Sequence, residues 1–427
     1  MKTKLLIFGI TGNLSIHRLL PALEQIISTG DFEDLSVIGA SRHKVKLDDL
    51  FIRCKNKMFL DNKLSIFEMD LTKADEYEKL KKIINLEDDE QLIIYLAVPP
   101  QATSQIVDFM GAAGINKSNV KILFEKPFGV DLESAKQLIE RTARYYKEDQ
   151  TYRIDHYLAK EMTQNIVAFR GRNALFSDIW NNNFIESIDI IASEKKDIEG
   201  RSQFYEQTGA LRDLMQGHLM QLLALVLMDI PRNFVWDKMP DLRLEALKHI
   251  SLADIRSVKR AQYEGYRDEV INPDSKVETF VSLELASRQP RWSGVPIRLT
   301  TGKALDKATT EIQIKLKKTD ESQSNNLIFR IQPDEGIDIE LFVKKPGYSR
   351  TFETRHLSFS FPSGTTLPDA YEQVIVDAIS SQKSLFTSSG EVLQSWRILQ
   401  PIQEKWADTK CPLMIYKKGS NIESILA

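Results

Sequence analysis

The chain has 427 residues, of which 42% are hydrophobic and 27% charged, and its formal net charge is -3 at pH 7. This length is too great for one ordinary core and the composition is that of a globular protein, so two domains are expected. The slight negative charge argues against nucleic acid or a membrane surface as the main partner, and no stretch has the roughly 18 consecutive apolar residues of a membrane span.

The chain opens on a strand, a glycine turn and a helix. Leu5–Gly9 is a buried apolar run, Gly9, Thr11 and Gly12 form a tight turn, and helical spacing begins at Leu14. In a doubly wound fold, the backbone of such a turn approaches a pyrophosphate and the helix N-terminus points at it. The spacing is GxxG rather than GxGxxG, so the turn alone is a weak signal.

Four further apolar runs alternate with helical stretches up to about residue 150. We expect these runs to be the strands Ser36–Ser41, Ser65–Asp70, Gln91–Pro100 and Val120–Gly129. Apolar strands that alternate with helices are typical of a parallel sheet covered on both faces. Residues 1–152 are therefore predicted to form a Rossmann-like domain that binds a coenzyme.

Arg42 follows the second predicted strand, where the adenosine ribose of a nicotinamide coenzyme would bind. An arginine there suits the 2′-phosphate of NADP, whereas NAD needs an acid, and the first acid, Asp48, comes too late in the chain. The sequence therefore favours NADP over NAD. The alternative is a solvated basic cluster at a strand end.

The second part of the chain alternates apolar and polar residues. Strands are expected at Phe184–Lys195, Ser275–Ser287 and Thr310–Lys318, and in the runs NLIFRIQP and GIDIELFVKK, with a helical block over Gly209–Met228. Residues 153–427 are therefore predicted to form an α+β domain, with a large, mainly antiparallel sheet and helices on one face.

Three motifs carry candidate chemistry, each with a plainer alternative. Lys126 in EKPFG ends the fifth strand, where it could face a ligand crevice or be a surface lysine in a turn. In RIDHYLAKE, a helix would put His156 and Lys160 on one face to grip a phosphate monoester; the alternative is an exposed, charged helix start. His218 lies on the apolar side of the helical block, as a core histidine or as a base.

The two cysteines, Cys54 and Cys411, belong to no CxxC or Cys/His cluster. We therefore expect no metal site and no disulfide, and free thiols suit the cytoplasm.

Taken in order, the motifs resemble those of the glucose-6-phosphate dehydrogenase family. The most specific is RIDHYLAKE, and the opening turn, EKPFG, RDLMQGHLMQ, RWSGVPIRLTTGKAL and LPDAYEQVI follow the family's order over residues 5 to roughly 400. The resemblance implies oxidation of C1 of D-glucose 6-phosphate to 6-phospho-D-glucono-1,5-lactone, with hydride transfer to NADP, in the oxidative pentose phosphate pathway. It also implies a homodimer or homotetramer whose partner is a small sugar phosphate.

The resemblance also implies residue roles. His218 would be the general base and Asp155 the carboxylate that orients it. The 6-phosphate would be held by His156, Tyr157 and Lys160, and Lys126 would touch both sugar and coenzyme. The remaining sugar contacts would be Glu194, Asp213, Lys303 and Gln332, and the remaining coenzyme contacts Gly9, Thr11, Gly12, Asn13, Leu14 and Arg42.

Alternatives stay open at this point. The turn reads GNL where the family usually has GDL, which leaves NAD as an alternative coenzyme. The substrate alternative is another hexose 6-phosphate, and a paralogue that binds sugar phosphate without turnover is an alternative of another class.

Overall fold

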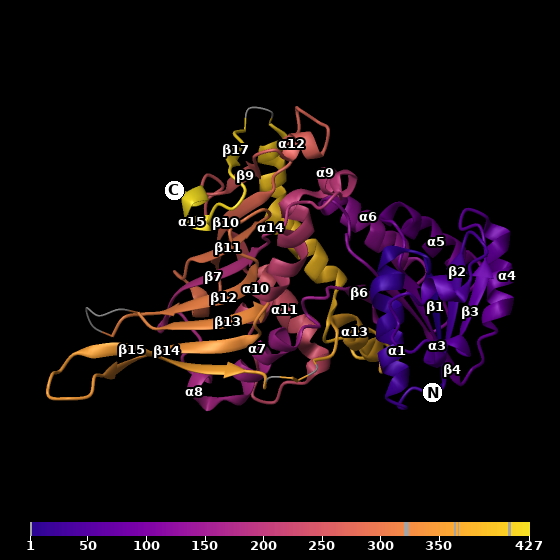
Figure 1. Cartoon of the computed structure of the whole chain (residues 1–427), viewed down its shortest axis with the longest axis horizontal. Coiled ribbons are helices and arrows are strands. Elements are labelled where there is room, and N and C mark those ends of the chain that lie inside the picture. The colour runs from indigo at the N-terminus through magenta and orange to yellow at the C-terminus, as the bar shows by residue number, and fades with distance from the viewer. Residues whose placement is uncertain (1, 320–323, 363, 366, 409–410) are drawn as a thin grey trace. The chain divides into compact units, whose positions relative to one another are not determined.

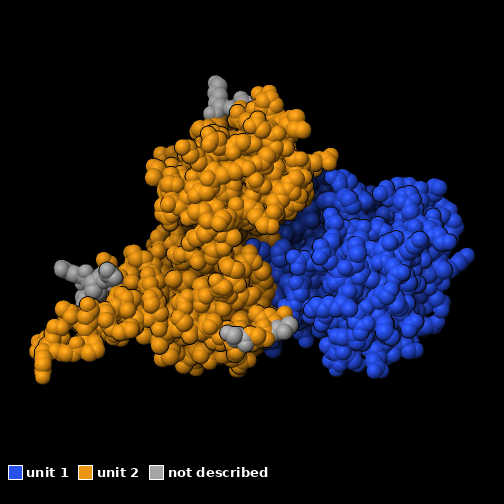
Figure 2. All heavy atoms as spheres, in the orientation of Figure 1, with its two compact units in different colours: residues 1–159, 235–240, 368–393 blue, residues 160–234, 241–367, 394–427 orange. Residues whose placement is uncertain are grey.

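The computed structural model describes residues 2–319, 324–362, 364–365, 367–408 and 411–427. The chain forms two compact units, both discontinuous in sequence (Figure 2). Unit 1 is drawn from residues 1–159, 235–240 and 368–393, and unit 2 from residues 160–234, 241–367 and 394–427. The domain boundary expected after residue 152 stays a prediction.

Unit 1 is built on a seven-stranded sheet in the order β16-β6-β5-β4-β1-β2-β3. All neighbouring pairs are parallel except β16 and β6. The parallel strands are nearly continuous apolar runs because helices cover both faces of such a sheet. The strands are Lys2–Phe8 (β1), Leu35–Ser41 (β2), Leu64–Glu68 (β3), Glu90–Leu96 (β4), Val120–Phe124 (β5), Thr151–Ile154 (β6) and Phe386–Thr387 (β16).

The helices of unit 1 connect these strands, and α13 packs against α1 although 340 or more residues separate them in the chain. This confirms the expected parallel, Rossmann-like sheet. The helices are Ser15–Leu19 (η1), Leu20–Ser28 (α1), Leu47–Leu50 (α2), Met58–Asp61 (α3), Ala74–Ile84 (α4), Pro100–Ala112 (α5), Leu132–Ala143 (α6), Glu148–Gln150 (η2), Trp236–Lys238 (η4) and Ala370–Ile379 (α13).

Unit 2 contains a ten-stranded sheet whose main path is β15-β14-β13-β12-β7-β11-β10-β9-β17, with β8 paired to β10. Its pairs are antiparallel except β7–β11 and β9–β17, which confirms the expected, mainly antiparallel sheet. Figure 1 shows β14 and β15 as a long hairpin that extends beyond the neighbouring strands. The strands are Ile185–Ser193 (β7), Ile250–Leu252 (β8), Lys259–Tyr263 (β9), Phe280–Ser287 (β10), Ile297–Gly302 (β11), Thr309–Leu316 (β12), Asn326–Gln332 (β13), Gly336–Lys344 (β14), Phe352–Ser360 (β15) and Met414–Tyr416 (β17).

The helical block predicted at 209–228 is a π-helix (η3) followed by α10, and η3 packs on β7 and β11. No helix in the described ranges is both long and apolar enough to cross a membrane. The helices are Glu161–Arg172 (α7), Ala174–Ser177 (α8), Ser202–Ala210 (α9), Leu211–Leu219 (η3), Met220–Leu227 (α10), Tyr266–Glu269 (α12), Pro290–Trp292 (η5) and Ile422–Leu426 (α15), together with Met239–Lys248 (α11) and Ser389–Ala407 (α14), which contain residues of both units.

Two local expectations from the sequence differ from the structure. The strand expected from Ser275 begins at Phe280; before it, the Glu278 carbonyl accepts from the Ala210 N–H. Residues 156–159 form a turn, and the helix begins only at Glu161, so the shared helical face of His156 and Lys160 does not form. The alternative prediction for this motif, an exposed and charged helix start, is also wrong, because Asp155 and Tyr157 are buried.

Candidate active site

A glycine turn joins β1 to the helix after it. Gly9 has a φ of 82°, and a Cβ on it would lie 2.2 Å from the carbonyl oxygen of Ala97, so only glycine fits there. The Gly12 N–H and the Ser15 hydroxyl both donate to the Gly9 carbonyl, each at 2.9 Å. Gly9 therefore lets the turn pack against the Ala97 backbone, and doubly wound folds bind a pyrophosphate at glycine turns of this kind.

A cavity of about 410 Å³ lies at the carboxyl ends of β1, β2, β3 and β4. Four predicted coenzyme residues, Gly9, Thr11, Gly12 and Arg42, line it, whereas Asn13 and Leu14 belong to the same turn but do not line it. The other lining residues are Ala40, Ser41, Asp70, Leu71, Thr72, Ala97, Val98, Pro99, Ala102 and Gln105.

Asp70 and Thr72 in this cavity were missed by the sequence analysis. The Asp70 carboxylate accepts from the Thr72 hydroxyl at 2.7 Å and from the Thr72 N–H at 3.0 Å, and these bonds lower the pKa of Asp70. Arg42 acts in the same direction more weakly. Asp70 is the last residue of a predicted strand, and ligands bind at the carboxyl ends of strands in such sheets. That position could have identified Asp70 as a residue of the coenzyme cavity.

Lys126 and Asp155 come from two neighbouring parallel strands of unit 1. Lys126 lies two residues beyond β5 and Asp155 directly follows β6, and the two strands pair through Phe124 and Arg153. Asp155 is only 1% exposed and accepts a hydrogen bond from the Tyr157 N–H at 3.0 Å. The sheet thus brings these two predicted residues to the same edge.

The His156 imidazole lies among aromatic rings. Its centroid is 5.2 Å from that of Tyr157 and 6.3 Å from that of Tyr371, which stacks on it at an interplanar angle of 21°. Tyr371, in α13, lies in the LPDAYEQVI motif, but no role was assigned to it from the sequence, because its contact with His156 joins residues more than 200 positions apart. Both rings restrict the orientation of His156.

Glu125 lies immediately before Lys126 and was also missed. Its carboxylate accepts a hydrogen bond from the hydroxyl of Tyr95, which is fully buried on β4. Burial raises the pKa of Glu125 to about 7, against the lowering effects of Tyr95 and Lys126, and the charge of Asp155 raises it further. A carboxyl group that titrates near neutral pH therefore lies beside two predicted site residues.

In unit 2, the π-helix η3 carries both Asp213 and His218. His218 is 3% exposed, and the Asp213 side chain is 23% exposed. The two residues are five positions apart, which is the hydrogen-bonding interval of a π-helix, and π-helical segments are frequent at functional sites.

Three predicted sugar contacts meet in unit 2. The Lys303 ammonium bonds the Glu194 carboxylate and lies 3.7 Å from that of Asp213. Glu194 and Lys303 directly follow the parallel neighbours β7 and β11, and the Glu194 N–H donates to the Gly302 carbonyl at 2.9 Å. Lys303 is 1% exposed and lies 5.2 Å from the centre of the Tyr205 ring. The cluster is thus two carboxylates around one buried ammonium.

Gln332 lies near this cluster, whereas Lys160 lies at the start of a helix of unit 2. Gln332 ends β13 and donates to the Thr310 hydroxyl at 3.2 Å, and Thr310 pairs with Ala192 of β7, near Glu194. Lys160 immediately precedes α7, where its charge lowers the otherwise raised pKa of Glu335.

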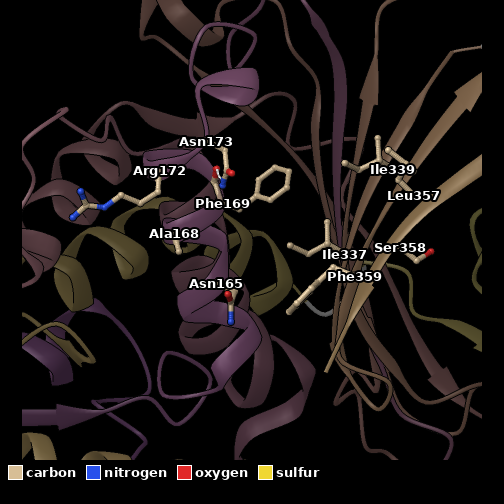
Figure 3. Close-up of a pocket in the computed structure, with 10 residues that line it drawn as sticks. All are labelled: Asn165, Ala168, Phe169, Arg172, Asn173, Ile337, Ile339, Leu357, Ser358 and Phe359. Atoms are coloured by element: carbon tan, nitrogen blue, oxygen red, sulfur yellow. Dashed lines mark hydrogen bonds between the residues drawn. The ribbon is translucent and has the colours of Figure 1, made fainter. Parts of the chain in front are cut away.

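A second cavity, of about 480 Å³, is separate from all of these residues. It lies between α7 and the β14–β15 hairpin, with Phe169 directed at the strands and Arg172 directed away from them (Figure 3). Among the described residues, no group of three or more His, Cys, Asp or Glu side chains is arranged to hold a metal ion.

Both parts of the chain match models of one protein family. Residues 6–165 match the family model described as "Glucose-6-phosphate dehydrogenase, NAD binding domain", and residues 167–424 match "Glucose-6-phosphate dehydrogenase, C-terminal domain". The chain belongs to the glucose-6-phosphate dehydrogenase family. It is therefore an oxidoreductase with a domain for a nicotinamide nucleotide.

Individual family members match over nearly the whole chain. The glucose-6-phosphate 1-dehydrogenase of Borreliella burgdorferi is 35% identical, over 99% of this chain and 96% of the relative. A solved glucose-6-phosphate dehydrogenase in complex with its substrate glucose-6-phosphate matches with a TM-score of 0.93 and 30% identity, over 100% of this chain and 97% of that chain. The enzyme from Mycobacterium avium matches with a TM-score of 0.87, 30% identity, and coverages of 98% and 94%.

A nicotinamide dinucleotide fits the first cavity. Gly9 and Gly12 line this cavity without side chains, and Thr11 and Arg42, which also line it, offer donors to phosphate oxygens. These residues would hold the coenzyme, which supplies a hydride acceptor when bound.

Proposed function

We propose that this chain oxidises C1 of D-glucose 6-phosphate to 6-phospho-D-glucono-1,5-lactone, with hydride transfer to NADP. The observation that carries this proposal is the Glu194–Lys303–Asp213 cluster of unit 2. Sugar hydroxyls donate to carboxylates and accept from ammonium groups, so the cluster suits a polyhydroxylated substrate. Family membership supports the same reaction.

The proposed roles follow from the chemistry of each group. His218 takes the proton of the C1 hydroxyl, which a neutral imidazole can do near pH 7. Asp155 accepts from the other ring nitrogen and so selects the tautomer. His156, Tyr157 and Lys160 bind the 6-phosphate, and Lys126, Glu194, Asp213, Lys303 and Gln332 hold the sugar. Fixing the substrate away from the reacting carbon supplies the orientation on which such catalysis depends.

We propose NADP as the preferred coenzyme because Arg42 lines the nucleotide cavity and can pair with a 2′-phosphate. Arg42→Ala should raise the Kd for NADPH by about tenfold or more and change that for NADH much less, since only the former has the phosphate. Titrations of both reduced coenzymes by fluorescence measure this. Equal losses would mean that Arg42 does not contact the 2′-phosphate.

A substrate panel tests the main proposal. Several hexose 6-phosphates, each with NADP and with NAD, are assayed by the absorbance of reduced coenzyme at 340 nm. Glucose 6-phosphate with NADP should give the highest kcat/KM. A higher value with another sugar phosphate would reassign the substrate, and binding without any reduced coenzyme between pH 6 and 9 would make the chain a non-catalytic binding protein.

We also propose a homodimer or homotetramer in the cytoplasm. The β14–β15 hairpin exposes apolar side chains, among them Phe352 at 67% and Leu357 at 60%, which fits an oligomer contact. Cys54 and Cys411 are unpaired thiols, which fits a reducing compartment. Light scattering after gel filtration and cell fractionation test the two statements, and a monomer or a secreted protein would contradict them.

A further inference from the structure

Glu278 is a buried carboxylate to which neither the sequence nor the proposed reaction assigns a role. It lies in unit 2 just before β10 and is 5% exposed. Burial raises its pKa, while a bond from the Leu211 N–H and the charges of Arg212 and Arg260 lower it. Burying a carboxylate is costly unless it is hydrogen-bonded, so its partners indicate what it does.

Those partners are the first backbone N–H of the π-helix and the N–H of the residue before it. The Leu211 N–H donates to Glu278 Oε1 at 3.0 Å, and the Ala210 N–H donates to the Glu278 backbone carbonyl at 3.0 Å. The first N–H groups of a helix have no partner within it, and the positive end of the helix dipole favours an anion. Glu278 therefore binds the start of η3 at two points.

Gly209 makes this contact possible. Its φ of 61° and ψ of 179° break the helical path near the end of α9, two residues before η3 begins, and a Cβ on it would lie 2.5 Å from Glu278 Oε1. The chain thus turns directly beneath the carboxylate, and any larger residue would displace it. Gly209 and Glu278 together determine where η3 begins and in which direction it runs.

The π-helical form controls how Asp213 and His218 are presented. In an α-helix, residues five apart point in directions about 140° apart, because each turn takes 3.6 residues. In a π-helix, the bond from residue i to residue i+5 brings such residues close to one side. A change of η3 to α-helical form would therefore separate the two side chains.

We propose that Glu278 is a positioning residue for the reaction: with Gly209 it anchors the π-helix so that Asp213 and His218 face the substrate together. This inference rests on the proposed function, in which both residues act on the sugar. Glu278 itself touches neither substrate nor coenzyme and acts through the helix.

Three variants and one control test the inference. Glu278→Ala removes the acceptor, Gly209→Ala displaces it, and Glu278→Gln keeps an acceptor oxygen. Glu206→Ala is the control, because the Glu206 carboxylate also accepts three hydrogen bonds in unit 2, from Tyr266, Asn272 and Ser275, but none from η3. The readouts are kcat, KM, thermal stability and the NMR signals of the His218 ring, identified by their loss in His218→Asn.

Glu278→Ala and Gly209→Ala should lower kcat about 10²-fold, the cost of misplacing a catalytic group by about 1 Å, with a smaller change in KM. Both should shift the His218 signals, and Glu278→Gln should recover at least about tenfold of the lost kcat. Glu206→Ala should lose stability but keep the wild-type kcat and His218 signals. If Glu278→Ala does not fold, Gly209→Ala tests the same contact.

A folded Glu278→Ala or Gly209→Ala with wild-type kcat and His218 signals would overturn the inference, as would Glu206→Ala with the same losses. A failure of this inference can be told apart from a failure of the proposed function. If the wild-type chain reduces no coenzyme, or if His218→Asn stays active, the proposed reaction fails, yet the His218 signals still report whether Glu278 positions the helix.

Discussion

A single buried imidazole carries the proton transfer of the proposed reaction. His218→Asn should lower kcat about 10²–10⁴-fold with little change in KM, because asparagine fills similar space but cannot take the proton. Steady-state kinetics with glucose 6-phosphate and NADP measure this. An unchanged Kd for NADPH serves as the control for folding, and a loss of less than about tenfold would remove His218 from the role of base.

Glu125 makes the stability of the chain depend on pH. Burial raises its folded-state pKa from 4.5 to about 7, so the folded chain binds a proton that the unfolded chain has already lost. This contribution is complete below about pH 4.5 and is lost as the pH rises towards 7. Glu125→Gln keeps the neutral form, so its Tm relative to wild type should increase between pH 5 and 7 and then level off.

Tyr95→Phe provides the matched control for that prediction. Without the tyrosine hydroxyl, the Glu125 carboxylate loses a hydrogen bond to its charged form, so the pKa of Glu125 should rise. The pH range over which Glu125 changes the Tm should therefore move to higher pH. Thermal scans of the three proteins from pH 5 to 8.5 measure both effects. A pH-independent difference between Glu125→Gln and wild type would show that Glu125 does not titrate in this range.

The candidate site could be predicted from the sequence where the family resemblance assigns a role to a residue, but not where a role depends on which segments pack together. Lys303 and Asp213, in the family's motifs, and Glu194, at the end of a predicted strand, were predicted from the resemblance, and the structure brings them together. Tyr371, by contrast, meets His156 across more than 200 residues. Contacts of this kind depend on which segments pack together, which one sequence does not reveal.

At the scale of elements, the end of α10 depends on one buried arginine. The Arg170 guanidinium, on α7, bonds the carbonyls of Leu225 and Met228 and lies 5.0 Å from the centre of the Trp180 ring. Carbonyls at a helix C-terminus have no partner in the helix. Arg170 supplies hydrogen-bond donors from outside this helix, although burial lowers the pKa of Arg170 to about 9.

Arg170→Ala should therefore destabilise the chain by about 3 kcal/mol, since it leaves buried carbonyls without donors. Arg172→Ala is the matched control on the same helix, because Arg172 is exposed and its guanidinium lies over the Phe234 ring. Urea unfolding of both variants gives the comparison. Equal losses in the two variants would mean that the carbonyl contacts do not stabilise α10.

The elements themselves followed closely from the sequence where apolar runs were long. The strand expected at Ser36–Ser41 agrees with β2 to within one residue, and the strand expected at Val120–Gly129 begins with β5, because a parallel strand buried on both faces is a continuous apolar run. The end of β5, however, lies five residues earlier than expected. The π-helical form of residues 211–219 was not predicted. The apolar spacing there fits an α-helix as well, and the contact with Glu278 depends on β10, far along the chain.

At the scale of the whole molecule, unit 1 is completed by residues 368–393. β16 pairs with the edge strand β6, and the buried Lys121 ammonium donates to the carbonyls of Ala378 and Ile379 at the end of α13. Without that segment, the Lys121 charge loses two of its acceptors. Leaving a buried charge without its partners is strongly destabilising.

A fragment of residues 1–159 should therefore lack a cooperative thermal transition. The same fragment joined through a long glycine-serine linker to residues 368–393 should regain one, because β16 and α13 can then take their places. Calorimetry of the two proteins tests this. A cooperative transition of the short fragment at the temperature of the fusion would contradict the prediction.

Because residues 368–393 belong to unit 1, this unit stays incomplete until most of the chain has been synthesised. The ribosome produces residues 160–367 before the segment that completes unit 1 can emerge, which takes about 10–40 s at 5–20 residues per second. During that interval the β6 edge lacks its neighbour and Lys121 lacks its carbonyls. The nascent N-terminal part of unit 1 is thus the segment that a chaperone must protect, and substitutions at Ala378 and Ile379, at the end of α13 away from Tyr371, should reduce the yield of protein in cells more than they reduce the activity of the molecules that fold.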